Sequence, residues 1–502
     1  MRVAAVRVMI GAALCVGMVW TPVATVSAQN SPETAWQKGA IGHAQAMRKF
    51  PDVDKGNQAA PDILPQFQAN SDPSGMIATE QSNGVTVTKT NPFFQSLGSN
   101  DRSCVTCHQP QNGWTVSAAG IQARFAASNG ADPIFRLVDG ATCPSDDVSS
   151  LAAKLDAYHL LLTKGLLRIG LPIPTGAEFT VTVLNDPYGC NTNPATGLTS
   201  SSSGIVSVYR RPLPSTNLGF LSAIMWDGRE PSLTSQAIDA TLGHAQADAP
   251  PSIAQQKQIV AFESGLETAQ SYDNAAHDLN AAGASGGPAA LLDQLATFFI
   301  GINDPFGLNP TGALFTPNIF TLYDAWASLP GSDSVTAARE QIARGEAIFN
   351  TTPITIIGVA GINDAATPSV SGFCGTCHDT PNVGNHSVKA PLDIGIADAG
   401  AKAPPALDIT GLPVFSLLCV SGPLAGTNFT VTDPGRALIS GKCADIGKLK
   451  GPDLRGLASR APYFHNGSAA TLMDVVNFYD QRFSLNFTAQ QKADLVAFLN
   501  AL

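Results

Sequence analysis

Two short cysteine–histidine motifs constrain this 502-residue chain more than any other feature. In Cys104-Val-Thr-Cys107-His108 and Cys374-Gly-Thr-Cys377-His378, two thiols are spaced to add to the vinyl groups of one haem, and the adjacent histidine becomes the proximal iron ligand. A redox dithiol or half of a zinc site is the alternative, but neither needs the histidine that follows both pairs. The motifs predict two covalently bound haem c groups.

The N-terminus resembles a secretory signal. Arg2 and Arg7 precede an apolar run over 8–20, and small residues at 26–28 offer a cleavage site before Gln29. This run is too short for a membrane span, and no other apolar run of about 20 residues follows. Covalent haem on an exported protein predicts the periplasm of a bacterium. Loss of the two arginines takes the formal charge from −10 to −12, which argues against nucleic acid as a partner.

Four cysteines outside the signal and the motifs form two local pairs, one after each haem motif. They suggest the disulfides Cys143–Cys190 and Cys419–Cys443, although three connectivities are possible in principle. Free thiols would be expected in a reducing compartment. Each disulfide would contribute about 3–4 kcal/mol in the chain-entropy model.

The length and texture of the chain predict a mainly α fold with two cytochrome c-type haem domains and a small β-containing insertion in the first. Alternating residues at 178–183 and 204–209 predict the strands of that insertion, on either side of a polar loop. The expected division is a signal peptide at 1–28, a leader segment at 29–90, an N-terminal haem c domain with insertions at 91–330 and a C-terminal cytochrome c domain at 331–502.

Helical patterns are clearest in the second domain. Residues 338, 342, 345 and 349 recur at helical spacing just before the second haem motif. Thr471-x-x-Asp474 and Thr488-x-x-Gln491 are typical of helix starts. The first of these starts is followed by one apolar face, made of Leu472, Val475, Val476, Tyr479 and Phe483. The second opens a closing helix that is expected to bury Leu495, Phe498, Leu499 and Leu502.

Two further motifs support a family resemblance. Trp226-Asp-Gly-Arg229 lies between the haem motifs, and Ala461-Pro-Tyr-Phe-His-Asn-Gly467 follows the second. In this order, from about residue 91 to the C-terminus, the chain resembles the bacterial di-haem cytochrome c peroxidase superfamily, which includes MauG-like enzymes. The resemblance implies a peroxide-reactive haem on His108, an electron-relaying haem on His378, Trp226 between them and His465 near a cofactor. The alternative for Trp226 is a buried structural tryptophan.

The resemblance also implies a distal pocket for the first haem. Gln236 would lie in it, but Gln246 stands where the family has its acid–base glutamate, and an amide cannot shuttle protons. His244, two residues earlier, is predicted to take that role. The alternative is a histidine satisfied on a helix or bonded to a propionate. No histidine occurs between Gln109 and Tyr158, so the first haem is expected to be open on its distal side.

The second departure concerns the second haem. Tyr479 stands where family peroxidases have an iron-ligating methionine, as it does in MauG-like enzymes, and Met473 falls off that helix face. Tyr479 is therefore predicted to ligate the second iron; the alternative is a core tyrosine. Calcium is doubtful, because Arg211 and Arg460 replace two residues of the family's calcium site, which keeps only Pro462.

Three functions remain open at this point. The first is a peroxidase that reduces hydrogen peroxide with electrons from a small c-type cytochrome or a copper protein. The second is a MauG-like oxidase or oxygenase that acts on an organic or protein substrate through high-valent haem. The third is a di-haem cytochrome that only transfers electrons. An open distal side argues against the third function. Tyr479 moves weight from the first function to the second, but the peroxidase is the function that we predict, with the other two as alternatives.

Overall fold

The computed structural model describes residues 61–201 and 204–502 of the chain. All of them belong to one unit, Phe50–Leu502. The predicted signal peptide and the first part of the predicted leader lie outside the described residues. The division into two haem domains at residue 330 stays a prediction.

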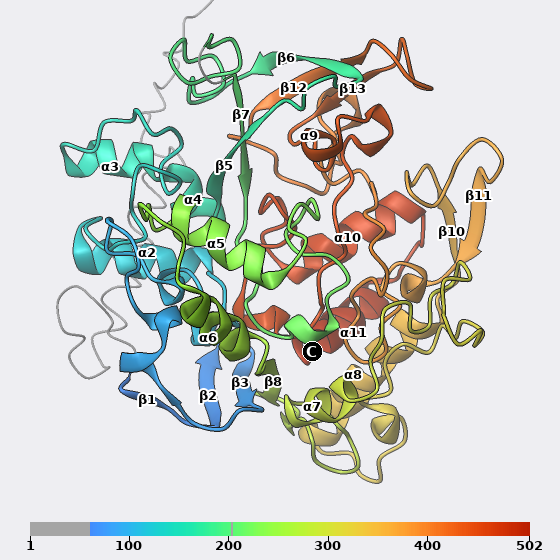
Figure 1. The fold of residues 1–502 in the computed structure, drawn as a ribbon. Helices are drawn as coiled ribbons and strands as arrows, with labels where there is room; N and C mark the ends of the chain where they lie inside the picture. The colour runs from blue at the N-terminus through green and yellow to red at the C-terminus, as the bar shows by residue number, and fades with distance from the viewer. Residues whose placement is uncertain (1–60, 202–203) are drawn as a thin grey trace, which may run out of the picture. The chain divides into compact units, whose positions relative to one another are not determined.

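The expectation of a mainly α protein holds only in part, because the structure is mixed, with 29% helix and 17% strand. In the described residues the strands form five small sheets rather than one local insertion. Figure 1 shows these sheets distributed over the molecule. Two of them have strands contributed by distant parts of the chain, which alternation in the sequence does not reveal.

The end of the predicted leader is part of a sheet. Strands β2 (Phe67–Asp72) and β3 (Gly75–Gln81) form an antiparallel pair. β3 also pairs with β8 (Leu266–Asp273), and β8 pairs in turn with β9 (His277–Asp278). Two short strands, β1 (Ile63–Leu64) and β4 (Thr86–Val87), pair beside them. The hydroxyl of Thr79 in β3 accepts a hydrogen bond from Nε1 of Trp114, at 2.8 Å. The leader thus supports the loop that follows the first haem motif.

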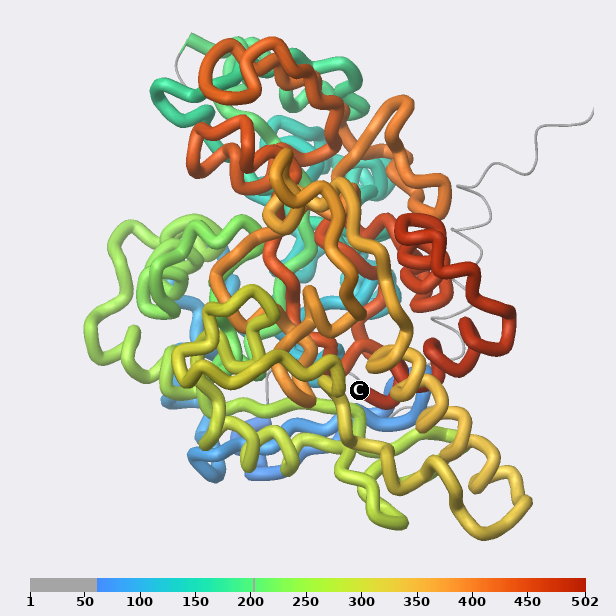
Figure 2. The backbone as a smooth tube through the Cα atoms, turned by 90° about the vertical axis from the view of Figure 1, so that its right-hand side faces the viewer, coloured from blue at the N-terminus to red at the C-terminus, as the bar shows by residue number. Residues whose placement is uncertain are grey.

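The predicted β-insertion is present, but its sheet extends beyond the insertion. Strand β5 (Leu167–Pro172) pairs with β7 (Ile205–Arg210), whereas β6 (Phe179–Asn185) pairs with β12 (Val414–Cys419), which pairs in turn with β13 (Asn428–Val431). In Figure 2, the green chain of the insertion lies beside the orange chain of the second half. The two halves of the chain therefore share a hydrophobic core here.

Both predicted disulfides are confirmed. Cys143 is linked to Cys190 and Cys419 to Cys443, with Cα–Cα distances of 5.3 and 6.1 Å. The first ties the insertion to the loop that precedes α3 (Leu151–Ala157), and the second ties β12 to the segment after α9 (Ala437–Ser440). The four cysteines of the haem motifs are unpaired.

Six α-helices are described in the first two-thirds of the chain. Most of them begin at a serine whose side chain accepts a backbone N–H, as capping requires. They are α2 (Ala118–Ser128), α3 (Leu151–Ala157), α4 (His159–Lys164), α5 (Leu233–Gly243), α6 (Ile253–Glu263) and α7 (Ala289–Leu295).

The helices predicted near the second haem motif are confirmed. α8 (Ser334–Thr351) covers the periodic residues before the motif, and α10 (Leu472–Phe483) and α11 (Ala489–Asn500) begin at capping boxes on Thr471 and Thr488. α8 packs against α11 at Gly345, where an added Cβ would lie 2.1 Å from the backbone oxygen of Asp494. Strands β10 (Ile354–Ile357) and β11 (Ser369–Gly372) form a hairpin between α8 and the motif.

No helix among residues 61–201 and 204–502 is long and apolar enough to cross a membrane.

Candidate functional site

Each haem motif begins with a short 3-10 turn, η4 (Cys104–Thr106) or η8 (Cys374–Thr376), and the second cysteine and the histidine follow that turn. Nδ1 of His108 lies 2.9 Å from the backbone oxygen of Trp114, and Nδ1 of His378 lies 2.6 Å from that of Gly384. A carbonyl only accepts hydrogen bonds, so Nδ1 carries the proton in both rings. Nε2 is left with its lone pair, which is the arrangement of a metal-ligating histidine.

Each motif lines a cavity of its own. Cys104, Cys107 and His108 line the first cavity, whose empty space is about 1480 Å³ including its open part. Cys374, Cys377 and His378 line the second, of about 1680 Å³. Burial lowers the pKa of His108 to about 4 and also lowers the pKa of His378, which keeps both imidazoles neutral. Two thiols and a neutral imidazole in a largely apolar cavity fit a c-type haem at each motif.

One face of α5 covers the first cavity. Gln236 lies on this face and lines the cavity as predicted, together with His244 at the C-terminal end of the helix. The lining positions are four residues apart in two rows, which puts them on one side of a helix. They are Leu233, Gln236, Ala237, Ala240, Thr241 and His244.

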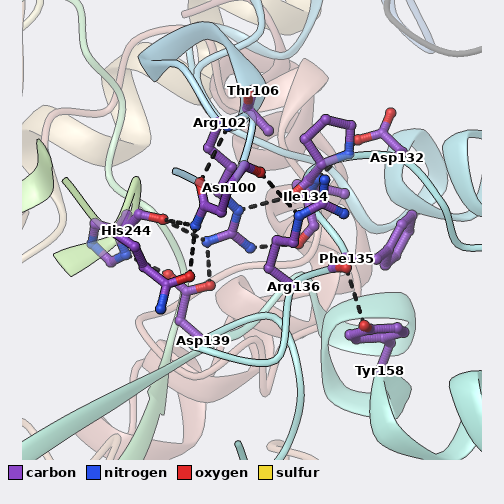
Figure 3. A network of polar contacts seen from close by, with 12 residues as sticks. Asn100, Arg102, Thr106, Asp132, Ile134, Phe135, Arg136, Asp139, Tyr158 and His244 are labelled. Atoms are coloured by element: carbon purple, nitrogen blue, oxygen red, sulfur yellow. Dashed lines mark hydrogen bonds and ion pairs between the residues drawn. The ribbon is translucent and has the colours of Figure 1, made fainter. Parts of the chain in front are cut away.

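His244 belongs to a polar network at the edge of the first cavity (Figure 3). Its Nδ1 is hydrogen-bonded to the carboxylate of Asp139, which also forms an ion pair with Arg102. The backbone oxygen of His244 accepts a hydrogen bond from Asn100, at 2.8 Å. Both the ring and the backbone of His244 are therefore held in place. Asp139 was not found from the sequence, because it precedes His244 by 105 positions and no motif marks it.

Gln246 does not line the first cavity. Its side-chain oxygen accepts a hydrogen bond from Asn100, at 3.1 Å, and its backbone oxygen accepts one from Ser99, at 2.8 Å. The backbone of Gln246 is left-handed, with φ of 54°. The structure thus places His244 at the cavity and Gln246 in the loop beside it.

A second group at the first cavity was also missed by sequence analysis. Glu263, the last residue of α6, lines the cavity, and its Oε1 has no hydrogen-bond partner. Burial raises the pKa of this carboxyl to about 8, so it is mostly protonated at neutral pH. Glu263 has no partner residue at a characteristic spacing in the sequence. The sequence therefore gives no signal that this carboxyl lines the cavity.

The second cavity is lined by the predicted apolar face of α10. All five residues of that face, Tyr479 included, are in its lining, whereas Met473 is not. Burial raises the pKa of the Tyr479 phenol above its ordinary value. The tyrosine and His378 face one space, so ligation of a metal by Tyr479 stays a prediction that this geometry permits.

Trp226 stands between the cavities and lines both. Its Nε1 donates to the backbone oxygen of Arg211, at 2.8 Å. The next residue, Asp227, is fully buried and bonds Arg210 and Arg229. The ring of Trp226 is thereby held at its edge and through the neighbouring backbone. It also packs in a hydrophobic cluster with Leu449 and Phe478, so it is both a wall residue of the two cavities and a core residue.

Arg211, which the resemblance places at a position of the family's calcium site, is hydrogen-bonded to the backbone oxygens around it. The buried guanidinium of Arg211 donates to the backbone oxygens of Lys164, Val116 and Arg460, at 3.0, 2.7 and 2.7 Å. A fixed cation thus satisfies three carbonyl oxygens, which are ligands of the type that calcium uses. Pro462 lines the second cavity nearby. Within the described ranges, no cluster of three or more His, Cys, Asp or Glu is arranged to hold a metal ion.

His465 lines neither cavity, and its expected place beside a cofactor stays a prediction. Its ring is fully buried, with its centroid 6.1 Å from that of Trp226, and its Nε2 lies 3.6 Å from Asp433. Burial lowers the pKa of His465 to about 4. The backbone oxygen of His465 accepts a hydrogen bond from the backbone N–H of Arg211. His465 therefore packs against Trp226 without lining either cavity.

Comparisons with known proteins give partial relatives. Cytochrome-c peroxidase IdrP1 from Pseudomonas sp. (strain SCT) is 32% identical over 142 residues, which are 26% of this chain and 36% of that protein. Cytochrome-c peroxidases IdrP2 and IdrP1 from Denitromonas iodatirespirans are each 44% identical, over 78 and 69 residues, or 14% and 12% of this chain and 21% and 18% of theirs. The alignments therefore span well under half the length of these relatives. No protein-family model matches the chain.

Among solved structures, a MauG-like protein associated with microbial copper homeostasis aligns with 82% of this chain and 86% of its own. The TM-score is 0.35 and the sequence identity is 16%.

Proposed function

Because this chain belongs to the di-haem cytochrome c peroxidase family, we propose that it reduces hydrogen peroxide to water in the periplasm. One molecule of peroxide takes up two electrons and two protons and yields two waters. A small c-type cytochrome or a copper protein would supply the electrons at the second cavity, and peroxide would react at the first. A haem bound in the first cavity would supply the iron at which peroxide is reduced.

The position of Trp226 carries this proposal. Its ring lines both cavities, and each cavity contains a histidine with its Nε2 lone pair free. An aromatic ring that bridges two redox sites is what electron transfer between them needs. The first cavity adds polar groups on one face of α5, where Gln236 can bind a peroxide oxygen and His244 can move a proton. The disulfides support an oxidising compartment.

The test is peroxide consumption by the mature holoprotein, expressed with c-type cytochrome maturation and supplied with a reduced donor. We expect two waters per two electrons, two haems per chain and a slower reaction in Trp226→Phe at unchanged haem content. Phe306→Tyr, at a half-exposed ring outside both cavities, is the matched control. A holoprotein that binds two haems and leaves peroxide unconsumed would overturn the proposal.

One observation favours a second candidate, a MauG-like oxidase that acts on an organic or protein substrate. Tyr479 lines the second cavity, and no methionine is found among that cavity's described lining residues. A phenolate ligand favours oxidised iron, whereas a thioether favours reduced iron. Under this candidate, peroxide with no added electron donor would give an oxidised organic product, and Tyr479→Phe would prevent its formation.

A further inference from the structure

We propose that Asp139 is a positioning residue for proton transfer at the first cavity and that it acts through His244. The inference rests on the proposed function, in which His244 serves as the acid–base group. It adds a residue that lies far from the α5 face in sequence and outside the cavity lining.

The hydrogen bond between the two side chains selects one tautomer of His244. An ionised carboxylate only accepts, so the Nδ1 that bonds Asp139 carries the proton. Nε2 then has the lone pair, on a side chain that lines the first cavity and is 39% exposed. A base oriented in this way takes a proton at Nε2, and the carboxylate behind it stabilises the imidazolium that forms.

Asp139 is itself held in place and kept charged. Arg102 pairs with its second oxygen, donates from Nε to the backbone oxygen of Pro133, at 2.8 Å, and from Nη2 to that of Ile134, at 2.6 Å. Burial alone would raise the pKa of Asp139, but the charge of Arg102 and the hydrogen bond from His244 hold it below the ordinary value. Figure 3 shows the carboxylate facing both partners. The network therefore holds an ionised carboxylate, paired with Arg102, against Nδ1 of His244.

The proton step balances without another reactant. Nε2 of His244 accepts the proton of one peroxide oxygen and returns it to the other oxygen, which leaves as water when the O–O bond breaks. The two electrons come from the donor protein, and two solvent protons complete the second water. In Asp139→Asn, an amide can donate to Nδ1, so Nε2 would carry the hydrogen and could not act as a base.

Cyanide binding to the ferric holoprotein tests this arrangement apart from peroxide turnover. Hydrogen cyanide must give up its proton to bind iron as the anion, so its binding rate reports the base at the first cavity. At neutral pH we expect His244→Gln to slow binding by about 100-fold or more, and Asp139→Asn by at least about tenfold. In the double variant, Asp139→Asn should add nothing to the effect of His244→Gln, because it acts only through that ring.

The matched control is Asp132→Asn. Asp132 lies in the same segment, pairs with Arg124 at 2.9 Å and lines neither cavity, so this variant should bind cyanide at the wild-type rate. If Asp139→Asn folds poorly, His244→Gln still tests the base, because it leaves the Arg102–Asp139 ion pair in place. The His244 side chain is partly exposed, so its replacement is not expected to prevent folding. Asp139→Glu should recover part of the rate, since it restores the acceptor.

Each outcome separates the two ideas. Equal cyanide rates in the wild type and Asp139→Asn, or equal effects of Asp139→Asn with and without His244, would overturn the role of Asp139 and leave the peroxidase proposal intact. A wild type that binds cyanide in an Asp139-dependent way but leaves peroxide unconsumed would overturn the peroxidase proposal and support the positioning role.

Discussion

Replacement of Arg210 should be among the most destabilising single changes that leave both haem motifs intact. Arg210 in β7 is 2% exposed and bonds Asp433 through Nε and Nη2, at 2.7 and 2.9 Å, while its Nη1 pairs with Asp227. In Arg210→Met the side-chain volume is largely kept, and Asp227 retains Arg229, at 3.0 Å. Asp433 keeps a backbone N–H, from Gly435 at 2.8 Å, and the buried ring of His465, whose Nε2 lies 3.6 Å away and whose pKa burial lowers to about 4. It therefore becomes a buried carboxylate without a charged counter-ion at neutral pH.

The magnitude follows from the proton that Asp433 would have to take up. An aspartate with an ordinary pKa of about 3.9 that is forced to be neutral at pH 7 costs about 1.4 kcal/mol per pH unit, or about 4 kcal/mol. This agrees with the loss of about 3–5 kcal/mol expected when a buried ion pair is broken from one side. We therefore expect Arg210→Met to lower the free energy of unfolding by about 4 kcal/mol at neutral pH.

The pH dependence has a definite sign. In the wild type, burial raises the pKa of Asp433, but the charge of Arg210 outweighs this effect, so the pKa is lowered. The contribution of Asp433 to stability is therefore present above about pH 4 and is lost as the pH falls further. In Arg210→Met the carboxyl is protonated more easily at low pH, so the penalty should shrink by about 1.4 kcal/mol for each pH unit below 7. The double variant Arg210→Met/Asp433→Asn removes the unpaired charge and should recover most of the loss.

Urea unfolding of the holoprotein at about pH 7 and about pH 5, followed by circular dichroism, measures both effects. Lys89→Met is the control, because its pair with Asp62 has the same 2.7 Å distance while both side chains are about 70% exposed. Such an exposed pair contributes at most about 1 kcal/mol. A loss below about 1 kcal/mol in Arg210→Met, or a loss that does not change with pH, would refute this reasoning.

Four further changes test the site. Cys374→Ala should remove one of two haems, as counted by mass spectrometry of the mature protein and by its pyridine haemochrome. Trp226→Phe should slow electron transfer between the two haems in stopped-flow absorbance while both stay bound; an unchanged rate would make the tryptophan a packing residue. Tyr479→Phe should alter the ferric EPR signal of one haem, and an unchanged spectrum would assign the tyrosine to the core. A chelator should leave wild-type unfolding unchanged, whereas Arg211→Met should cost about 2 kcal/mol or more because three buried carbonyls lose their donor.

Local patterns predicted the parts of the structure that depend on neighbours in sequence. The helix around α10 needed only a capping threonine and a 3.6-residue period, and its face at Tyr479 lines the second cavity as the spacing implied. The two disulfide pairs were also predicted, because each joins cysteines that are close in sequence. The sheet assignment fell short for the opposite reason, since β6 pairs with β12, more than 200 residues away, and a strand pattern does not name its partner.

The amino-acid sequence by itself determined which groups are available for chemistry, namely two thiol pairs that are each followed by a histidine and a tryptophan motif that lies between the two pairs in the chain. From these groups and from the N-terminal pattern it predicted covalent haem and an export signal. Only the tertiary structure decided what surrounds that chemistry. It placed Trp226 in the wall of both cavities, put Asp139 behind His244, left Gln246 outside the lining and used Arg211 as a fixed cation. The physical reason is that a motif encodes bond geometry over a few residues, whereas orientation, burial and charge balance arise from contacts between segments that are distant in the chain.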